Sequence, residues 1–324
     1  MTQAAPVIAV VIPCYKVGRH ILSVLANIGK EVAIIYVVDD KCPEGSGLLV
    51  QAQCHDPRVR VIFHDINKGV GGATISGYRQ AVADGATVAV KIDGDGQMDS
   101  GLIPMFVHPI LSGHADYTKG NRFFDIELLT SMPRLRLFGN SVLSLVSKVA
   151  SGYWDIMDPT NGFTAIHTTV LKHLSLDKLD ERYFFESDML FRLNVTRAVV
   201  QDIPLEARYG DEESSLNIAR VAREFPAKYL GRFAKRIFYN YVLRDFNAGT
   251  IELFMGGVLL LCGTLYGSWH WFISIYDGIP ATSGVVMLAA LPILVGFQLL
   301  ISAINFDIAN IPVRPVHKLY QPHP

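Results

Sequence analysis

The sequence predicts an α/β protein, with a Rossmann-like domain built on a parallel sheet, followed by interfacial amphipathic helices and two transmembrane helices. Apolar runs of strand length alternate with segments of helical spacing between residues 7 and 92, a pattern typical of a parallel sheet covered by helices. Two uncharged stretches in the last quarter are each long enough to span a bilayer. We expect the domain over residues 1–215, amphipathic helices over 216–250, a transmembrane hairpin over 251–306 and a tail over 307–324.

Polar residues follow three of the predicted strands at the point where each strand ends. The strands are expected at residues 7–13, 32–38, 59–63 and 86–92, with helices at 21–28 and 72–84. Ligands of such sheets bind beyond the carboxyl ends of the strands. Because Tyr15, Asp39 and Asp93 all follow strand ends, we expect a nucleotide to lie across these loops.

The strongest chemical signal is the segment KIDGDGQ, which places Asp93 and Asp95 on one side of the chain after the fourth strand. Hard cations such as Mg²⁺ or Mn²⁺ bind carboxylate oxygens and keep open positions for substrate phosphates. Gly94 and Gly96 let the backbone turn and a ligand approach closely. The alternative is a solvated acidic turn, because a lone D-x-D pattern is common.

Two further segments near the predicted nucleotide site have open interpretations. Asp39 and Asp40 end a buried strand, where one carboxylate is expected to accept hydrogen bonds from a base or ribose, unless both are turn residues facing solvent. The glycine-rich segment 67–81 opens a helix, and helix N-termini favour anions. Contact with the nucleotide and a packing role beneath the nucleotide loops are both consistent with this segment.

Composition separates the chain into a polar part and an apolar part. The formal net charge of −1 excludes a general electrostatic attraction to nucleic acid, and no nucleic-acid partner is expected. Hydrophobic residues make up 50% of the chain, and their excess is concentrated in the last quarter. The four cysteines have no C-x-x-C spacing and are expected to be free thiols.

The apolar stretches 253–273 and 284–304 are expected to form a transmembrane hairpin, with a buried soluble hairpin as the alternative. The linker between them has no Lys or Arg, whereas basic residues flank both outer ends, at Lys228, Arg232, Lys235, Arg236, Arg244, Arg314 and Lys318. By the positive-inside rule, both termini and the soluble domain are expected in the cytoplasm. No signal peptide is predicted at the N-terminus.

Basic and apolar residues alternate at helical spacing over residues 217–246. This pattern predicts interfacial helices broken at Pro226 that hold the domain close to an anionic membrane surface. A soluble amphipathic helix packed on the sheet is the alternative.

Taken together, the motifs VIPCYK, VVDD, NKGVGGA, KIDGDGQ and KGNRF resemble glycosyltransferase family 2 in their order and spacing. The whole chain is similar to the polyprenyl-phosphate branch of that family, the relatives of dolichol-phosphate-mannose synthase, in bacterial members of which two spans follow the domain. The resemblance implies a GT-A fold, a nucleoside-diphosphate-sugar donor, a polyprenyl (undecaprenyl) phosphate acceptor and a multi-pass location in the inner membrane.

The resemblance also implies roles for individual residues. It places the nucleotide against Pro13, Tyr15, Asp39, Asp40, Asp93 and Arg208. It places a Mg²⁺ or Mn²⁺ ion on Asp93, Asp95 and Gln97. It implies that Arg122, Arg136 and Asn140 bind the acceptor phosphate, with Arg134 as the alternative to Arg136.

Two implied features are less direct. The segment 207–215 resembles a lid over the diphosphate, with Arg208 and Ser214 as contacts, but its spacing departs from the family pattern. Segments PTNGF and FFESDML resemble the sugar pocket, with Glu186 and Asp188 where related enzymes keep an acid or base. A phosphate monoester is largely dianionic at neutral pH, so Asp188 is either a catalytic base or a positioning group.

The sequence therefore predicts a metal-dependent, inverting transfer of one sugar to polyprenyl phosphate on the cytoplasmic membrane face, with homo-oligomers possible through the membrane helices. Three alternatives are a processive polysaccharide synthase, an enzyme with a soluble acceptor, and a non-catalytic membrane scaffold. The absence of a Q-x-x-R-W motif and the presence of only two predicted spans argue against the first. The presence of both acidic residues of the D-x-D pattern argues against the scaffold.

Overall fold

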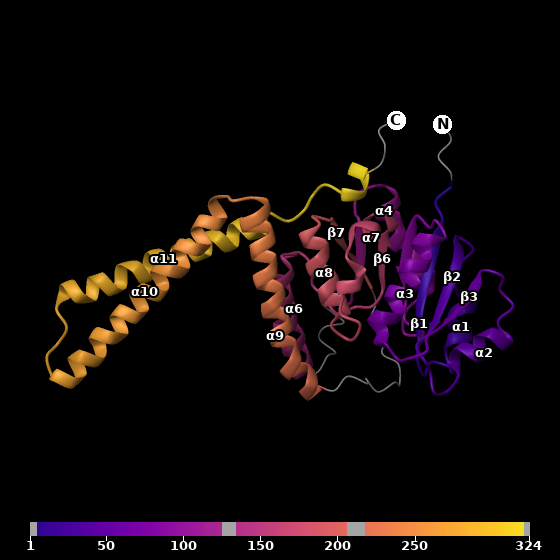
Figure 1. Ribbon diagram of the computed structural model, residues 1–324, viewed down its shortest axis with the longest axis horizontal. Helices are drawn as coiled ribbons and strands as arrows, with labels where there is room; N and C mark the ends of the chain where they lie inside the picture. The colour runs from indigo at the N-terminus through magenta and orange to yellow at the C-terminus, as the bar shows by residue number, and fades with distance from the viewer. Residues whose placement is uncertain (1–4, 125–133, 206–217, 321–324) are drawn as a thin grey trace. The chain divides into compact units, whose positions relative to one another are not determined.

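The computed structural model describes residues 5–124, 134–205 and 218–320 of the chain (Figure 1). It divides into two compact units, one of Met1–Phe233 with Pro312–Pro324 and one of Ala234–Ile311. The first unit contains the sheet, and the second contains the two long apolar helices.

Within the described residues, seven strands of the first unit form one sheet in the order β3-β2-β1-β4-β6-β5-β7. The strands are β1 Ile8–Cys14, β2 Val32–Asp39, β3 Val59–Phe63, β4 Val88–Lys91, β5 Tyr117–Asn121, β6 Thr164–His167 and β7 Val200–Pro204. The four strands predicted from the sequence are β1 to β4, and they pair in parallel. Strand β6, which was not predicted, pairs antiparallel with both β4 and β5, so the sheet as a whole is mixed.

Helices cover the two faces of the sheet. Val10 and Ile12 of β1 belong to one core cluster with side chains of α1 (Ile21–Ala26) and α4 (Ile103–Leu111). The intervening Val11 points to the other face, where α3 (Gly69–Ala83) packs so closely that a Cβ on Gly77 would lie 2.2 Å from Val11 Cγ1. This alternation follows from the two-residue repeat of a strand and gives a three-layer α/β/α unit.

The glycine-rich segment starts α3 three residues earlier than predicted, at Gly69. Gly69 has a φ of +87°, which favours glycine, and a Cβ on Gly71 would lie 2.5 Å from the Asp180 carbonyl oxygen. These glycines therefore let the start of α3 pack against the chain that leads into α8 (Phe185–Val195). The remaining helices of this part are α2 Ser46–Gln53, which was not predicted, α6 Arg134–Ser151 and α7 Thr168–His173.

Helix α9 (Ile218–Ile237) runs through Pro226, so the predicted break at this residue was wrong. Proline removes one backbone donor, but tertiary packing compensates on the opposite face. Phe225 and Tyr229 both pack edge-on against Phe184 at the start of α8. The Tyr229 hydroxyl also lies 2.7 Å from Ser187 Oγ. The chain leaves helical geometry only after a π-helix, Phe238–Arg244.

The second unit is a helical hairpin of α10 (Ala248–Asp277) and α11 (Ser283–Ala309). Within the described part of the chain, these are the two helices long and apolar enough to cross a membrane. Only 22% and 6% of their most apolar windows are buried, which is unlike the core helices of a soluble domain. The helices approach closely where Gly256 faces Gly296, because a Cβ on Gly296 would lie 2.8 Å from the Gly256 carbonyl oxygen.

The chain after the hairpin returns to the first unit. Asp116, at the start of β5, accepts hydrogen bonds from the backbone N–H groups of Val316 and His317 at 2.8 and 2.9 Å. The His317 ring nitrogen lies 2.6 Å from the same carboxylate, and the ring stacks on His167. Burial raises the pKa of Asp116, but these hydrogen bonds outweigh burial and lower it. Residues 316–320 are therefore part of the folded unit.

Candidate active site

A cavity of about 450 Å³ lies at the sheet edge where polar loops were predicted to meet. Strands β4, β5 and β7 end at this edge, and the antiparallel β6 begins there. The sheet therefore gathers loops that are far apart in the sequence. The cavity is lined by Asp93, Asp95, Gln97, Met98, Asp99, Leu102, Arg122, Thr160, Asn161, Gly162, Phe163, Pro204 and Leu205.

Asp93 contacts a buried lysine at the end of β4. Lys91 Nζ donates to Asp93 Oδ1 at 2.9 Å, to the Gly162 carbonyl oxygen at 3.2 Å and to Glu186 Oε1 at 3.2 Å. Burial alone lowers the pKa of Lys91, but the charges of Asp93 and Glu186 outweigh it and raise that pKa above its ordinary value. Lys91 therefore remains an ammonium cation inside the fold.

The loop after Asp93 keeps its carboxylates at the cavity. Asp95 Oδ1 accepts a hydrogen bond from the Gln97 backbone N–H at 3.0 Å, and Gly96 has a φ of +78°. Asp99 Oδ1 accepts from Gly101 N at 2.9 Å. The described residues contain no group of three or more His, Cys, Asp or Glu side chains suited to a metal. The oxygens of Asp93, Asp95 and Gln97 at the cavity fit a hard cation that takes its other oxygen ligands from a phosphate-bearing substrate and water.

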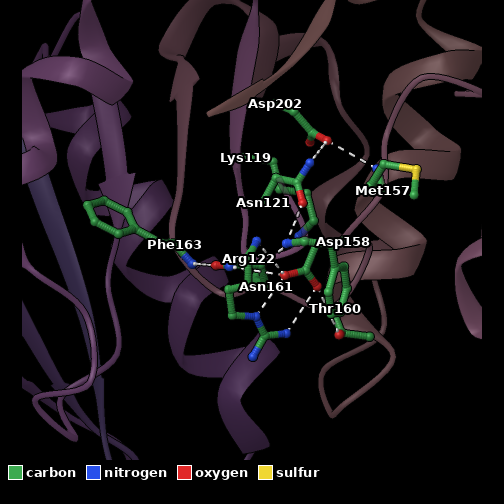
Figure 2. A network of polar contacts seen from close by, with 10 residues as sticks. Lys119, Asn121, Arg122, Met157, Asp158, Thr160, Asn161, Phe163 and Asp202 are labelled. Atoms are coloured by element: carbon green, nitrogen blue, oxygen red, sulfur yellow. Dashed lines mark hydrogen bonds and ion pairs between the residues drawn. The ribbon is translucent and has the colours of Figure 1, made fainter. Parts of the chain in front are cut away.

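Figure 2 shows a polar network centred on Asp158, and Arg122, Thr160, Asn161 and Phe163 of this network also line the cavity. The fully buried carboxylate of Asp158 accepts hydrogen bonds from Arg122 Nε at 2.7 Å and Arg122 Nη2 at 3.0 Å. Asn161 Nδ2 lies 3.3 Å from the same carboxylate. Burial raises the pKa of Asp158, but its hydrogen bonds and attraction to Arg122 outweigh burial and lower it. The guanidinium of Arg122 is thereby fixed at the cavity wall.

Two further groups of this network have strongly displaced pKa values, the buried Lys119 and the half-buried Asp202. Burial lowers the pKa of Lys119 to about 8, although its Nζ donates to the Asn161 carbonyl oxygen at 2.5 Å. Burial raises the pKa of Asp202 to about 6. Asp202 Oδ2 accepts from Asn121 Nδ2 at 2.9 Å and from Met157 N at 3.1 Å (Figure 2). These contacts support the loops that carry Arg122 and Asn161.

Four of the predicted nucleotide residues lie at the ends of β1 and β2: Pro13 and Asp39 are strand residues, whereas Tyr15 and Asp40 directly follow the strands. Tyr15 is exposed, and Pro13 lies within β1. Asp39 is buried, and its two oxygens accept from Cys42 N and Gly47 N, both at 2.7 Å.

Asp40 is also buried, and its carboxylate accepts from the N–H groups at the start of α3. Lys68 N donates to Oδ1 at 2.8 Å, and Gly69 N donates to Oδ2 at 2.7 Å. His64 Nδ1 lies 2.8 Å from Oδ1. Both aspartates therefore shape the backbone of these loops, and neither lines the cavity.

Asp188 lies on α8 away from the cavity lining, and its carboxylate is fully buried. Arg232 Nε donates to Oδ1 at 2.5 Å, Arg192 Nε lies 3.4 Å from Oδ2, and Asp180 N donates to Oδ2 at 2.9 Å. These contacts join α8 to α9 in the first unit.

Only part of the predicted acceptor site lies within the described residues. Asn140 is half-buried on α6, and Arg134 and Arg136 lie in the first turn of that helix, but the side chains of these two arginines lie outside the described residues. Arg208 and Ser214 also lie outside the described residues. Of the predicted site residues, the cavity brings together Asp93, Asp95, Gln97 and Arg122.

Sequence reasoning missed four charged residues that support the cavity, namely the buried Lys91, Lys119 and Asp158 and the half-buried Asp202. Two of them could have been recognised from their positions in the sequence. Lys91 is a charged residue within an apolar strand, two positions before Asp93, and Asp158 directly precedes the PTNGF segment. Charged residues are rarely fully buried unless they are paired, so a lysine in a buried strand predicts a nearby carboxylate.

A sequence profile described as Glycosyl transferase family 2 matches residues 9–175. The chain is similar to UDP-N-acetylglucosamine–dolichyl-phosphate N-acetylglucosaminyltransferase of Methanococcus voltae, with 28% identity over 64% of this chain and 88% of the relative. It is also similar to undecaprenyl-phosphate mannosyltransferase of Micrococcus luteus, with 27% identity over 56% of this chain and 75% of the relative.

The fold is similar to that of glucosyl-3-phosphoglycerate synthase from Mycobacterium tuberculosis, solved in complex with Mn²⁺, uridine diphosphate and glucosyl-3-phosphoglycerate. The TM-score is 0.56 at 19% identity, over 72% of this chain and 81% of that structure. This likeness confirms the predicted α/β architecture of the GT-A type.

Proposed function

Because the chain belongs to glycosyl transferase family 2, we propose that it transfers a single sugar from a nucleoside-diphosphate sugar to a polyprenyl phosphate at the membrane. The observation that carries this proposal is a cavity with carboxylates on one side and a fixed arginine on the other, in a chain with two long apolar helices. The carboxylates suit a cation-bound diphosphate, and the arginine suits a phosphate. Relatives named for dolichyl or undecaprenyl phosphate support the lipid acceptor.

We propose that Asp93 and Asp95, with Gln97, hold a Mg²⁺ or Mn²⁺ ion together with the donor diphosphate. When bound, such an ion neutralises charge that develops on the departing diphosphate. A protein of similar fold supports this choice, because the M. tuberculosis structure contains Mn²⁺ and uridine diphosphate. The nucleoside is proposed to lie along Pro13, Tyr15 and the loops that Asp39 and Asp40 hold in shape, and Arg208 is proposed to contact the donor.

On the acceptor side, Arg122, with Arg136 and Asn140, is proposed to bind the lipid phosphate. Asp158 holds Arg122 by two hydrogen bonds, so the guanidinium keeps one orientation without the ligand. A phosphate oxygen forms a bond to the anomeric carbon while the bond to the nucleoside diphosphate breaks, and the diphosphate leaves with the electron pair. The acceptor is largely dianionic at neutral pH, so no side chain has to remove a proton. A single displacement of this kind inverts the anomeric carbon.

The membrane arrangement is proposed from charge and connectivity. Basic residues flank the outer ends of both helices, and the linker between the helices contains none. The chains before α10 and after α11 both lead into the first unit, since residues 316–320 fold against Asp116. From the charge pattern and this connectivity, we propose that the chain before α10 and the chain after α11 are both cytoplasmic, in a protein of the inner membrane.

The test is to incubate the full chain in detergent with undecaprenyl phosphate, Mn²⁺ and a panel of nucleoside-diphosphate sugars, and to analyse the lipid phase by mass spectrometry. A sugar-phosphate-lipid product that disappears in Asp95→Asn is expected. A parallel reaction replaces the lipid with 3-phosphoglycerate, a soluble phosphate acceptor. Product formed only with the soluble acceptor would refute the lipid assignment, and unchanged product in Asp95→Asn would refute the role of this carboxylate.

A further inference from the structure

A line of three charged residues runs from the cavity into the interior of the first unit. Asp93 lines the cavity with its side chain 31% exposed, whereas the side chains of Lys91 and Glu186 are 1% and 11% exposed. Lys91 lies between the two carboxylates, 2.9 Å from Asp93 Oδ1 and 3.2 Å from Glu186 Oε1. An ammonium group has three donors, and the third contacts the Gly162 carbonyl oxygen. The donors of Lys91 are thus fully used inside the protein.

The two carboxylate oxygens of Asp93 have different surroundings. Oδ1 is held by Lys91, while Oδ2 lies over Gly162, where a Cβ would approach it to 2.5 Å. Among the described residues, no hydrogen-bond donor contacts Oδ2. The missing side chain at Gly162 leaves space for this oxygen and for Lys91 Nζ, which a Cβ would approach to 2.6 Å.

We propose that Lys91 is a positioning residue for the cation, because it holds Oδ1 of Asp93 and leaves Oδ2 as the single oxygen offered to the metal. This inference rests on the metal dependence proposed above. Glu186 acts as the buried counter-charge that keeps the Lys91 ammonium in place, not as an acid or base that contacts the sugar. Residues that orient a metal ligand typically change metal affinity about 10–100-fold when they are replaced.

The charge balance of the three residues determines which variants test this. Lys91→Met leaves the buried Glu186 without its partner, so it weakens the fold as well as the metal site. The double variant Lys91→Met/Glu186→Gln removes both buried charges and retains Asp93. The matched reference is Glu186→Gln, which keeps the contact between Lys91 and Asp93.

The experiment measures Mn²⁺ binding to the detergent-solubilised full chain by the electron paramagnetic resonance signal of free Mn²⁺, with UDP or GDP present. We expect Glu186→Gln to bind Mn²⁺ within about threefold of the unsubstituted protein, and the double variant to bind about 10–100-fold more weakly than Glu186→Gln. Thermal unfolding of both variants is recorded in parallel, so that a loss of folded protein is not counted as a loss of affinity.

Equal Mn²⁺ affinity in Glu186→Gln and the double variant would overturn the role of Lys91 while leaving the metal-dependent function intact. A more than tenfold loss of Mn²⁺ affinity in Glu186→Gln alone would overturn the assignment of Glu186 as a counter-charge, because Glu186 itself would then orient the metal ligands. Absence of Mn²⁺ binding by the unsubstituted protein with either nucleotide would instead refute the proposed metal dependence.

Discussion

Replacing Asp188 by asparagine is expected to weaken the fold far more than the chemistry. The substitution keeps the shape of the side chain but removes the charge that Arg232 and Arg192 face at 2.5 and 3.4 Å. Breaking a buried ion pair from one side costs about 3–5 kcal/mol. The arginine side chains are 20% and 14% exposed, so water screens part of this, and we expect a loss of about 2–4 kcal/mol.

That loss corresponds to a decrease in Tm of roughly 5–10 °C for a unit of this size. The rate at saturating substrate is expected to stay within about tenfold at a temperature where the variant is folded, since Asp188 does not line the cavity. Loss of a general base would instead lower the rate by about 10²–10⁴-fold.

The assay combines thermal unfolding followed by tryptophan fluorescence with initial rates of lipid-product formation. Arg232→Met is the partner variant, and the Asp188→Asn/Arg232→Met double variant should lose less stability than the sum of the two single losses. An unchanged Tm together with a hundredfold lower rate in Asp188→Asn would refute the positioning role and restore Asp188 as a catalytic base.

Three further predictions concern other parts of the first unit. The pKa of Asp202 is raised from 3.8 to about 6, so its contribution to stability is complete below pH 3.8 and is lost as the pH rises through 6. Relative to Asp202→Asn, the unsubstituted protein should therefore lose about 2–3 kcal/mol of unfolding free energy between pH 4 and 7, measured by denaturant titration. Parallel stability profiles of the two proteins over this pH range would contradict the prediction. Gly162→Ala should lower Mn²⁺ affinity and activity at least tenfold, because the added Cβ would overlap the carboxylate of Asp93. The control is Gly231→Ala on α9, where the Cβ has open space, and it should leave Mn²⁺ affinity and rate unchanged. Equal Mn²⁺ affinities and rates in the two variants would exclude the overlap. His317→Ala should cost about 1.5–3 kcal/mol by removing a hydrogen bond to the buried Asp116, measured by thermal unfolding; an unchanged Tm would show that the returning chain does not stabilise the unit.

Local patterns were sufficient for much of the fold. Four apolar runs predicted β1 to β4, because a buried parallel strand must be apolar on both faces. The D-x-D segment and KGNRF predicted Asp93, Asp95 and Arg122, and the structure brings these residues to one cavity. The long uncharged stretches coincide with α10 and α11, since a span of apolar residues is visible without knowledge of packing.

Other features depended on contacts between segments distant in the sequence. The antiparallel β6 between β4 and β5 could not be inferred from its four residues, of which only Ala165 and Ile166 are apolar, because strand direction is set by partners and not by composition. Pro226 predicted a helix break, but aromatic packing against Phe184 keeps α9 continuous. In both cases tertiary packing outweighed the local preference.

The amino-acid sequence by itself determined which residues carry charge and where apolar segments alternate, and so it was enough to predict the class of enzyme and the carboxylates at its centre. Only the tertiary structure decided what each charge does. Asp188 and Glu186 are two positions apart on α8, yet one faces the arginines of α8 and α9 and the other faces Lys91 behind the cavity. Residues two positions apart on a helix point to nearly opposite sides, because each residue turns about 100° around the axis, and the role of a buried charge is set by the partner it meets there.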